Sequence, residues 1–165
     1  MATSRQVRVQ GAAKLAADFS RMAASVRGPV LANAAKAGGI VIEAEAKRRV
    51  ARKTSTLFRS IHTEVVTQSA DSATVSIGTN VEYGPYLEYG TGIHGPKGTE
   101  IIIRPKRAGG VLRFTIGNRV VFAREVRSPG MRPRPFLGPA FESKSKEAFE
   151  TMAKAVWQQV KKAAS

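Results

Sequence analysis

Apolar residues recur with a helical period at both ends of this chain and with a period of two in its middle. Near the N-terminus, spacings of four, three and four predict an amphipathic helix over residues 12–27, with the stripe Leu15, Phe19, Met22 and Val26. Near the C-terminus, spacings of eight, three, four and four predict a helix over residues 138–163, with the stripe Phe141, Phe149, Met152, Val156 and Val160. Helices, then strands, then a helix is the order typical of the α+β class.

Gly28-Pro29 separates the first helix from a second one, predicted over residues 29–52, because proline suits the first helical turn. This second helix contains Gly38-Gly39. Each glycine costs about 1 kcal/mol in a helix interior. Close packing against another element is one reason for a chain to keep such glycines.

Period-two alternation marks the strands. Residues 57–66 and 73–77, joined by a polar turn, predict a β-hairpin. Further strands are predicted at residues 5–9, 101–103, 111–116 and 120–126. Prolines exclude helix and central strand from residues 128–135, which we expect to be an extended connector. The expected fold is one mostly antiparallel sheet packed against two N-terminal helices and one long C-terminal helix.

Several classes of protein are excluded by what the 165 residues lack. The chain has no cysteine, so a disulfide framework, a zinc-thiolate site or a cysteine nucleophile is impossible. No apolar run approaches the ~18 residues of a membrane span, and residues 1–6 show no apolar signal-peptide core. We expect one soluble domain over residues 1–165, with a Gly-rich loop region at 90–110 and an extended Pro-rich arm at 127–135.

The formal net charge of +15 is unevenly divided. It amounts to +9 in residues 1–60, −4 in 61–103, +8 in 104–135 and +2 in 136–165. A simple nucleic-acid binder more often shows one basic stripe with no acidic block inside it. Alternating blocks also suit a subunit that docks on copies of itself or on neighbours of opposite charge.

No arrangement of residues indicates catalysis, a metal site or a cofactor. Residues 90–95 match G-x-G-x-x-G, but the Gly-Pro-Lys-Gly that follows cannot readily open the helix that a dinucleotide site needs, so a flexible loop is the better interpretation. His62 and His94 lack metal-ligand spacing. Carboxylates that could be paired are Glu82, Glu88 and Glu100, without any further catalytic signature. We therefore expect a protein that is not an enzyme and binds no cofactor.

Basic clusters could hold phosphates or acidic partner proteins without reading a base sequence. The candidates for a DNA channel or an acidic partner are Lys47, Arg48, Arg49, Arg104, Lys106 and Arg107. Aromatic residues are poorly interleaved with them, since Phe114 and Phe122 are expected in the core. This pattern allows nonspecific contact with DNA and does not indicate sequence-specific recognition.

Three runs of residues resemble a known family. They are Thr56-Leu-Phe-Arg-Ser-Ile61, Val81-Glu-Tyr-Gly-Pro-Tyr-Leu-Glu-Tyr-Gly-Thr91 and Arg132-Pro-Arg-Pro-Phe-Leu-Gly-Pro-Ala140. Together, and in this order, they resemble the neck or tail-completion proteins of tailed bacteriophages, the minor tail components of lambdoid-type siphophages. One departure is that Ser55 or Thr56 stands where the family usually has Gly.

The resemblance implies a structural virion protein, made in the host cytoplasm, that forms a ring in the neck around the DNA channel. It implies a six-fold or twelve-fold homo-oligomer that contacts the head connector or stopper and the tail-tube or terminator proteins. A tail-terminator ring is the alternative, and a nonspecific basic DNA-binding protein is a further one. Tyrosine and arginine favour interfaces, so the predicted subunit-interface residues are Tyr83, Tyr86, Glu88, Tyr89, Thr91, Arg132, Arg134 and Phe136. The alternative for the tyrosines is that they fill the core. Phe136 is also expected to anchor the arm in the core of its own chain.

Overall fold

The computed structural model describes residues 12–50 and 55–164. These residues fall into two compact units. Unit 1 comprises residues 12–45, 62–78 and 141–164, and unit 2 comprises the described part of residues 46–61 together with 79–140. The strand predicted at residues 5–9 lies outside the described residues, and the prediction of one domain over the whole chain stays a prediction.

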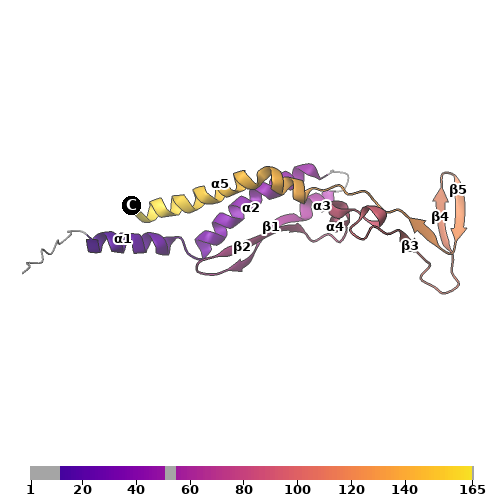
Figure 1. Cartoon of the computed structure of the whole chain (residues 1–165), viewed down its shortest axis with the longest axis horizontal. Helices are drawn as coiled ribbons and strands as arrows, with labels where there is room; N and C mark the ends of the chain where they lie inside the picture. The colour runs from indigo at the N-terminus through magenta and orange to yellow at the C-terminus, as the bar shows by residue number, and fades with distance from the viewer. Residues whose placement is uncertain (1–11, 51–54, 165) are drawn as a thin grey trace, which may run out of the picture. The chain divides into compact units, whose positions relative to one another are not determined.

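The N-terminal helices have the predicted boundary between them. Helix α1 spans Ala12–Ser25 and α2 spans Pro29–Arg49 (Figure 1). Gly28 has a φ of +55° and donates its N–H to the Ala70 carbonyl oxygen at 3.0 Å. Because side chains disfavour that φ, a glycine suits this turn. Leu15 and Phe19 are exposed, so the apolar stripe predicted on α1 is only partly covered by the described chain.

Two glycines bring α2 close to its neighbours in unit 1. A Cβ at Gly38 would collide with the Met152 side chain and lie 2.9 Å from the backbone oxygen of Ala148. A Cβ at Gly39 would lie 2.5 Å from Cγ2 of Thr63. The close packing predicted for this glycine pair is therefore confirmed, against the C-terminal helix on one side and the first strand on the other.

We expect Gly38→Ala to lower the free energy of unfolding by about 1–2 kcal/mol. Overpacking typically costs about 1–3 kcal/mol, and the better helix propensity of alanine offsets part of this. Denaturant unfolding followed by circular dichroism measures the change. The control is Gly78→Ala, because a Cβ there meets no atom within 4 Å. Equal stability of the two variants would contradict the close contact.

The predicted hairpin follows α2. It consists of β1, Ile61–Gln68, and β2, Ala73–Thr79, which pair as a two-stranded sheet. The turn is polar, as expected, and the Ser69 N–H donates to the Ser72 carbonyl oxygen at 2.8 Å. One prediction here was wrong: the first residues of the expected strand belong to a short helix, α3, Ser55–Ser60. Only residues 57–60 of the expected strand lie in this helix, and four residues are too few for a period of two to exclude a helical turn.

Unit 2 contains the remaining short elements. They are α4, Gly84–Tyr89, the 3-10 turn η1, Gly92–His94, and the strands β3, Ile101–Ile103, β4, Leu112–Ile116, β5, Arg119–Ala123, and β6, Val126–Ser128. Strand β3 pairs antiparallel with β6, and β4 pairs antiparallel with β5. Helix α4 was not predicted, although Pro85 in its first turn is a helix-start signal.

The mixed helix and strand composition and the long C-terminal helix, α5, Leu137–Ala164, are confirmed. The strands, however, form three two-stranded sheets in the described chain, and the single continuous sheet was wrong. Alternation identifies a strand but not its partner. Here β3 pairs with a strand more than twenty residues further on, and the hairpin of β4 and β5 lies between them in the sequence.

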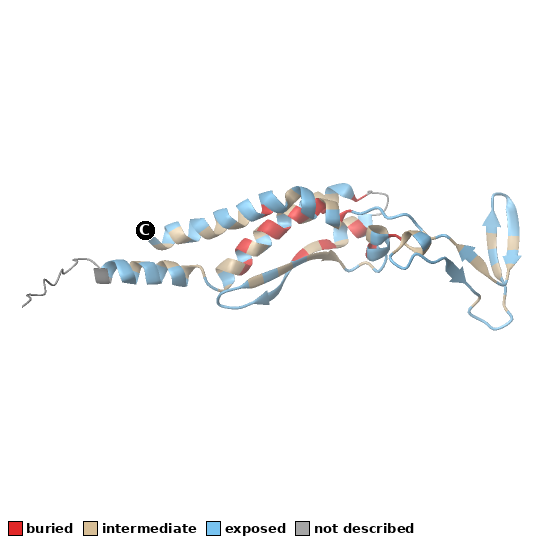
Figure 2. Cartoon of the chain, viewed as in Figure 1, coloured by how far each residue is buried: buried red, intermediate tan, exposed pale blue. Residues whose placement is uncertain are grey.

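Figure 2 shows the buried residues in red, and most of them have small side chains. The buried residues of unit 1 are Ala32, Ala34, Gly38, Gly39, Ile42, Thr63 and Ala148, and the buried apolar side chains of unit 2 are Ala46, Val50, Leu57, Ile61, Phe136 and Ala140. Many larger apolar side chains lie outside this core. Phe141 and Phe149 are exposed, so the apolar stripe predicted on α5 is buried only in part.

Candidate functional site

The three tyrosines of the chain lie on or beside α4. Pro85 occupies the first turn of this helix, and Gly90 ends it with a φ of +76°. The exposed fractions of Tyr83, Tyr86 and Tyr89 are 38%, 56% and 64%. The alternative that these side chains fill the core is therefore wrong for the described chain, and they form a surface that we call the tyrosine surface.

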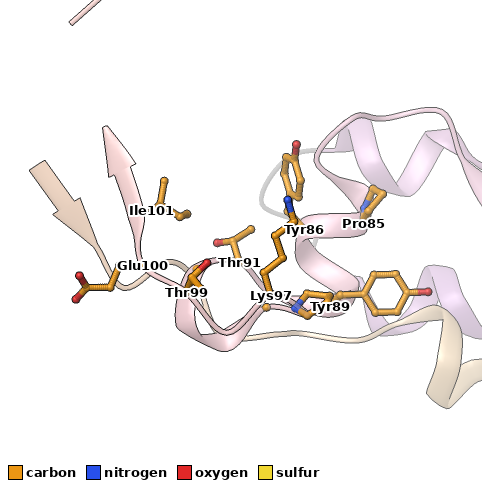
Figure 3. Close-up of a pocket in the computed structure, with 12 residues that line it drawn as sticks. Pro85, Tyr86, Tyr89, Thr91, Lys97, Thr99, Glu100 and Ile101 are labelled. Carbon is orange, nitrogen blue, oxygen red and sulfur yellow. The ribbon is translucent and has the colours of Figure 1, made fainter. Parts of the chain in front are cut away.

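A hollow of about 360 Å³ adjoins the tyrosine surface (Figure 3). Tyr86 and Tyr89 line it from α4, and Thr99, Glu100 and Ile101 line it from the segment that enters β3. Its remaining lining residues are Pro85, Gly90, Thr91, Gly92, Gly95, Pro96 and Lys97. Aromatic rings, prolines and glycines thus surround a cavity of the size in which proteins bind small molecules, roughly 300–1,000 Å³.

The Gly-rich loop is held against the Pro-rich arm by backbone hydrogen bonds. The Thr91 N–H donates to the Met131 carbonyl oxygen at 2.9 Å, and the Ile93 N–H donates to that of Pro129 at 2.9 Å. Gly92 has a φ of +65°, and a Cβ on it would collide with Pro129. These bonds correct the interpretation of residues 90–95 as a flexible loop. The three-residue turn η1 lies within this run and no longer helix opens from it, whereas a dinucleotide site needs a helix there.

Glu88 joins α4 to the start of α5. Its carboxylate accepts the backbone N–H groups of Phe136 at 2.8 Å, Leu137 at 3.0 Å and Gly138 at 2.8 Å. The first N–H groups of a helix have no acceptor within the helix, and a negative charge is favoured there by the helix dipole. The structure therefore gives Glu88 a role within its own chain, while its role as a subunit-interface residue stays a prediction.

The arm of residues 127–135 also makes contacts within unit 2. The Arg134 N–H donates to the Leu87 carbonyl oxygen at 2.7 Å, and the Met131 N–H donates to Oγ1 of Thr91 at 2.9 Å. Phe136 is only 2% exposed, which confirms that it anchors the end of the arm in its own core. Its burial is at odds with its other predicted role, as a subunit-interface side chain. The side chains of Arg132 and Arg134 are exposed.

Some of the predicted basic clusters already have partners in the chain. Nζ of Lys47 lies 5.8 Å from the ring centroid of Phe58, and Arg48 and Arg49 are exposed at the end of α2. Lys106 and Arg107 are exposed between β3 and β4.

Glu125 is the centre of an ion-pair group at the β3 and β6 sheet. The Arg104 guanidinium donates to it at 2.8 Å and, with Arg127 at 3.4 Å, holds the pKa of its carboxyl below the usual value. Arg127 also lies 4.0 Å from Glu100. Arg104 is thus partly neutralised, which weakens its candidacy as a group that faces DNA.

A surface that the sequence interpretation missed is the hairpin of β4 and β5. Phe122 was expected in the core, but its side chain is 63% exposed, so that prediction was wrong. Arg113, the cross-strand partner of Phe122, is also exposed, and Arg119 is exposed on the other face of the hairpin. The signal that could have indicated this surface is a run of charge: residues 105–124 contain five Lys and Arg residues and no acid.

Neither histidine belongs to a metal-binding group. His62 lies 3.8 Å from the carboxylate of Glu64, and His94 lies in η1. Within residues 12–50 and 55–164, no three His, Asp or Glu side chains come together in a way that could hold a metal ion. None of the helices in that part of the chain combines the length and the apolar character needed to cross a membrane.

One family of known proteins matches this chain. No curated protein and no solved structure matches it. Residues 13–90 match the model of the HK97-gp10_like family, described as "Bacteriophage HK97-gp10, putative tail-component". The matched range includes the tyrosine surface and Glu88, and it ends before the arm and the hairpin of β4 and β5. Over residues 13–90 the chain is therefore similar to the HK97-gp10-like tail components of bacteriophages, and the resemblance inferred from its three sequence runs is confirmed.

Proposed function

We propose that this chain is a structural subunit that forms a ring in the phage neck, joins the head connector to the tail tube and surrounds the DNA channel. The similarity to phage tail components by itself implies contact with other virion proteins. The proposal adds the ring and its position in the neck. The chain acts by assembly in the virion and carries out no reaction.

The observation that carries the proposal is the number of large apolar side chains that unit 2 leaves exposed. They are Tyr83, Tyr86, Tyr89, Ile93, Ile101, Ile102, Ile103, Val111, Ile116, Val120, Phe122 and Met131. Monomeric soluble proteins rarely expose contiguous apolar patches of more than a few hundred Å². A subunit whose surface becomes buried in a closed ring, and between stacked rings, has a physical reason to carry them.

The charges of the chain suit the same arrangement. Subunits that meet head to tail use two different surfaces, which must be complementary. The acidic block of residues 61–103 lies in the sequence between two basic blocks. In this proposal most basic residues meet acidic protein surfaces, and a minority that includes Lys106 and Arg107 faces DNA.

Loss of this chain from a phage should leave filled heads and tails of normal length that do not join. The reason is that a ring between head and tail is needed for attachment and not for building either part. Electron microscopy of lysates from a deletion mutant measures this, with a plasmid-borne copy as control. Cryo-EM of the complete particle should place the chain in the neck.

Two other results would contradict the proposal. Tails of uncontrolled length in the deletion mutant would favour the alternative, a tail-terminator ring. Density for the chain in the capsid shell or at the distal end of the tail would exclude a neck ring.

A further inference from the structure

The hairpin of β4 and β5 has one face that no residue in the described part of its own chain covers. Its register pairs Arg113 with Phe122 and Thr115 with Val120, so these four side chains lie on the same face. All four are exposed. On the opposite face Leu112, Phe114, Val121 and Ala123 are half-buried, whereas Ile116 and Arg119, next to the turn, are exposed.

Such a hairpin has physical reasons to acquire a partner. An isolated two-stranded ribbon is marginally stable in water, and here one of its faces exposes an aromatic and a β-branched side chain to solvent. Arginine and aromatic residues together are the composition enriched in protein–protein interfaces. Phosphates are held by cationic and polar groups, so a DNA backbone would leave the side chains of Phe122 and Val120 without suitable contacts.

A complementary surface exists in the same unit. The tyrosine surface presents the exposed rings of Tyr86 and Tyr89 beside the hollow of about 360 Å³. Glu82 stands next to this surface, is exposed, and makes no ion pair with any residue that the structure describes. Tyrosine rings attract arginine guanidinium groups, and a free carboxylate suits the hairpin, because the segment of residues 105–124 that contains it carries five positive charges and no negative one.

We propose that the β4–β5 hairpin of one copy docks on the tyrosine surface of a second copy, with Phe122 in the hollow and Arg113 beside Glu82. The two surfaces are different, so the contact is head to tail and can be repeated around a ring. The inference rests on the proposed ring for the choice of a second copy as the partner. It adds the residues that make the contact between neighbouring subunits.

Cysteine cross-linking tests the contact directly, because the chain has no cysteine of its own. A chain with Phe122→Cys is mixed with a differently tagged chain with Tyr86→Cys, and the mixture is oxidised. A disulfide-linked pair that carries both tags is expected. The matched control replaces Phe122→Cys by Ile102→Cys, since Ile102 is also exposed in unit 2 but lies outside the proposed contact.

Equal yields of linked pairs from the test and control mixtures would overturn the proposal. Charge reversal in the cross-linked pair adds a second criterion. Arg113→Glu in the Phe122→Cys chain should lower the cross-link yield several-fold, and Glu82→Arg in the other chain should restore it. A yield that Glu82→Arg fails to restore would overturn the pairing of Arg113 with Glu82.

DNA is the competing partner, and the same proteins test it. If the hairpin binds DNA, a short duplex should abolish the cross-link at physiological salt, and Arg113→Glu should weaken DNA binding. That result would mean that the partner of the hairpin is DNA and not a second copy of the chain. The cross-link uses purified protein, so its failure is distinguishable from a failure of the neck position, which only the particle reveals.

Discussion

Replacing Phe136 by alanine should lower the free energy of unfolding by about 3–5 kcal/mol, the usual cost of truncating a buried phenylalanine. Its side chain is 2% exposed and is the largest aromatic side chain in the core of the described chain. Denaturant unfolding followed by circular dichroism measures the loss. Such a loss is a large part of the roughly 5–15 kcal/mol by which proteins are stable, so partial unfolding at 37 °C is also expected.

Two exposed phenylalanines provide matched controls for this prediction. Phe149→Ala, at a side chain that is 71% exposed, should change the stability by at most about 0.5 kcal/mol. Phe122→Ala should also leave the fold stable while weakening the contact between copies. A Phe136→Ala protein as stable as the Phe149→Ala protein would contradict the burial of Phe136 and its role as the anchor of the arm.

Replacing Glu88 by alanine should lower the free energy of unfolding by about 2–3 kcal/mol. The change removes a charged acceptor from three backbone N–H groups, of Phe136, Leu137 and Gly138. Losing a side-chain cap alone costs about 0.5–2 kcal/mol, and hydrogen bonds to charged groups are worth about 1.5–3 kcal/mol each. Glu88→Gln should have an intermediate stability, because the amide keeps one acceptor oxygen but loses the charge and the second acceptor.

Glu82→Ala is the control for this second prediction, since Glu82 is exposed and six residues away in the same unit. Its stability should stay within about 0.5 kcal/mol of the parent. Equal losses in Glu88→Ala and Glu82→Ala would contradict the cap on α5. Because of the cap, Glu88→Lys should impair ring formation by destabilising each subunit. The unfolding of this variant must therefore be measured before any loss of assembly is assigned to an interface.

The sequence predicted the role of Phe136 in the core but not the role of Glu88 as a helix cap. Phe136 stands between a run of prolines and an apolar helix start, so its role as an anchor follows from local pattern. Glu88 lies about fifty residues before the helix that it caps. A contact over that separation leaves no periodic signal, and the acidic residue beside tyrosines was naturally interpreted as an interface group.

The strands also show that contacts between distant residues leave no periodic signal in the sequence. Alternation located the residues of β2, β4 and β5, because side chains of a strand point to opposite faces in turn. It did not indicate that β3 pairs with β6 or that the strands form separate two-stranded sheets. It also placed Phe122 in a core, because it shows which residues share a face but not whether that face is covered.

The sequence by itself determined the helices at both ends, the hairpin after the second helix, the uneven charge and the similarity to phage tail components. These follow from short-range periodicity, glycine and proline chemistry, and runs of neighbouring residues. Only the tertiary structure decided that Glu88 holds the start of α5, that the Gly-rich loop is bonded to the arm, and that the tyrosines and Phe122 face outward. Each of these features depends on which distant segments of the chain come into contact. Burial and hydrogen-bond pairing result from those contacts, so no local stretch of residues determines them.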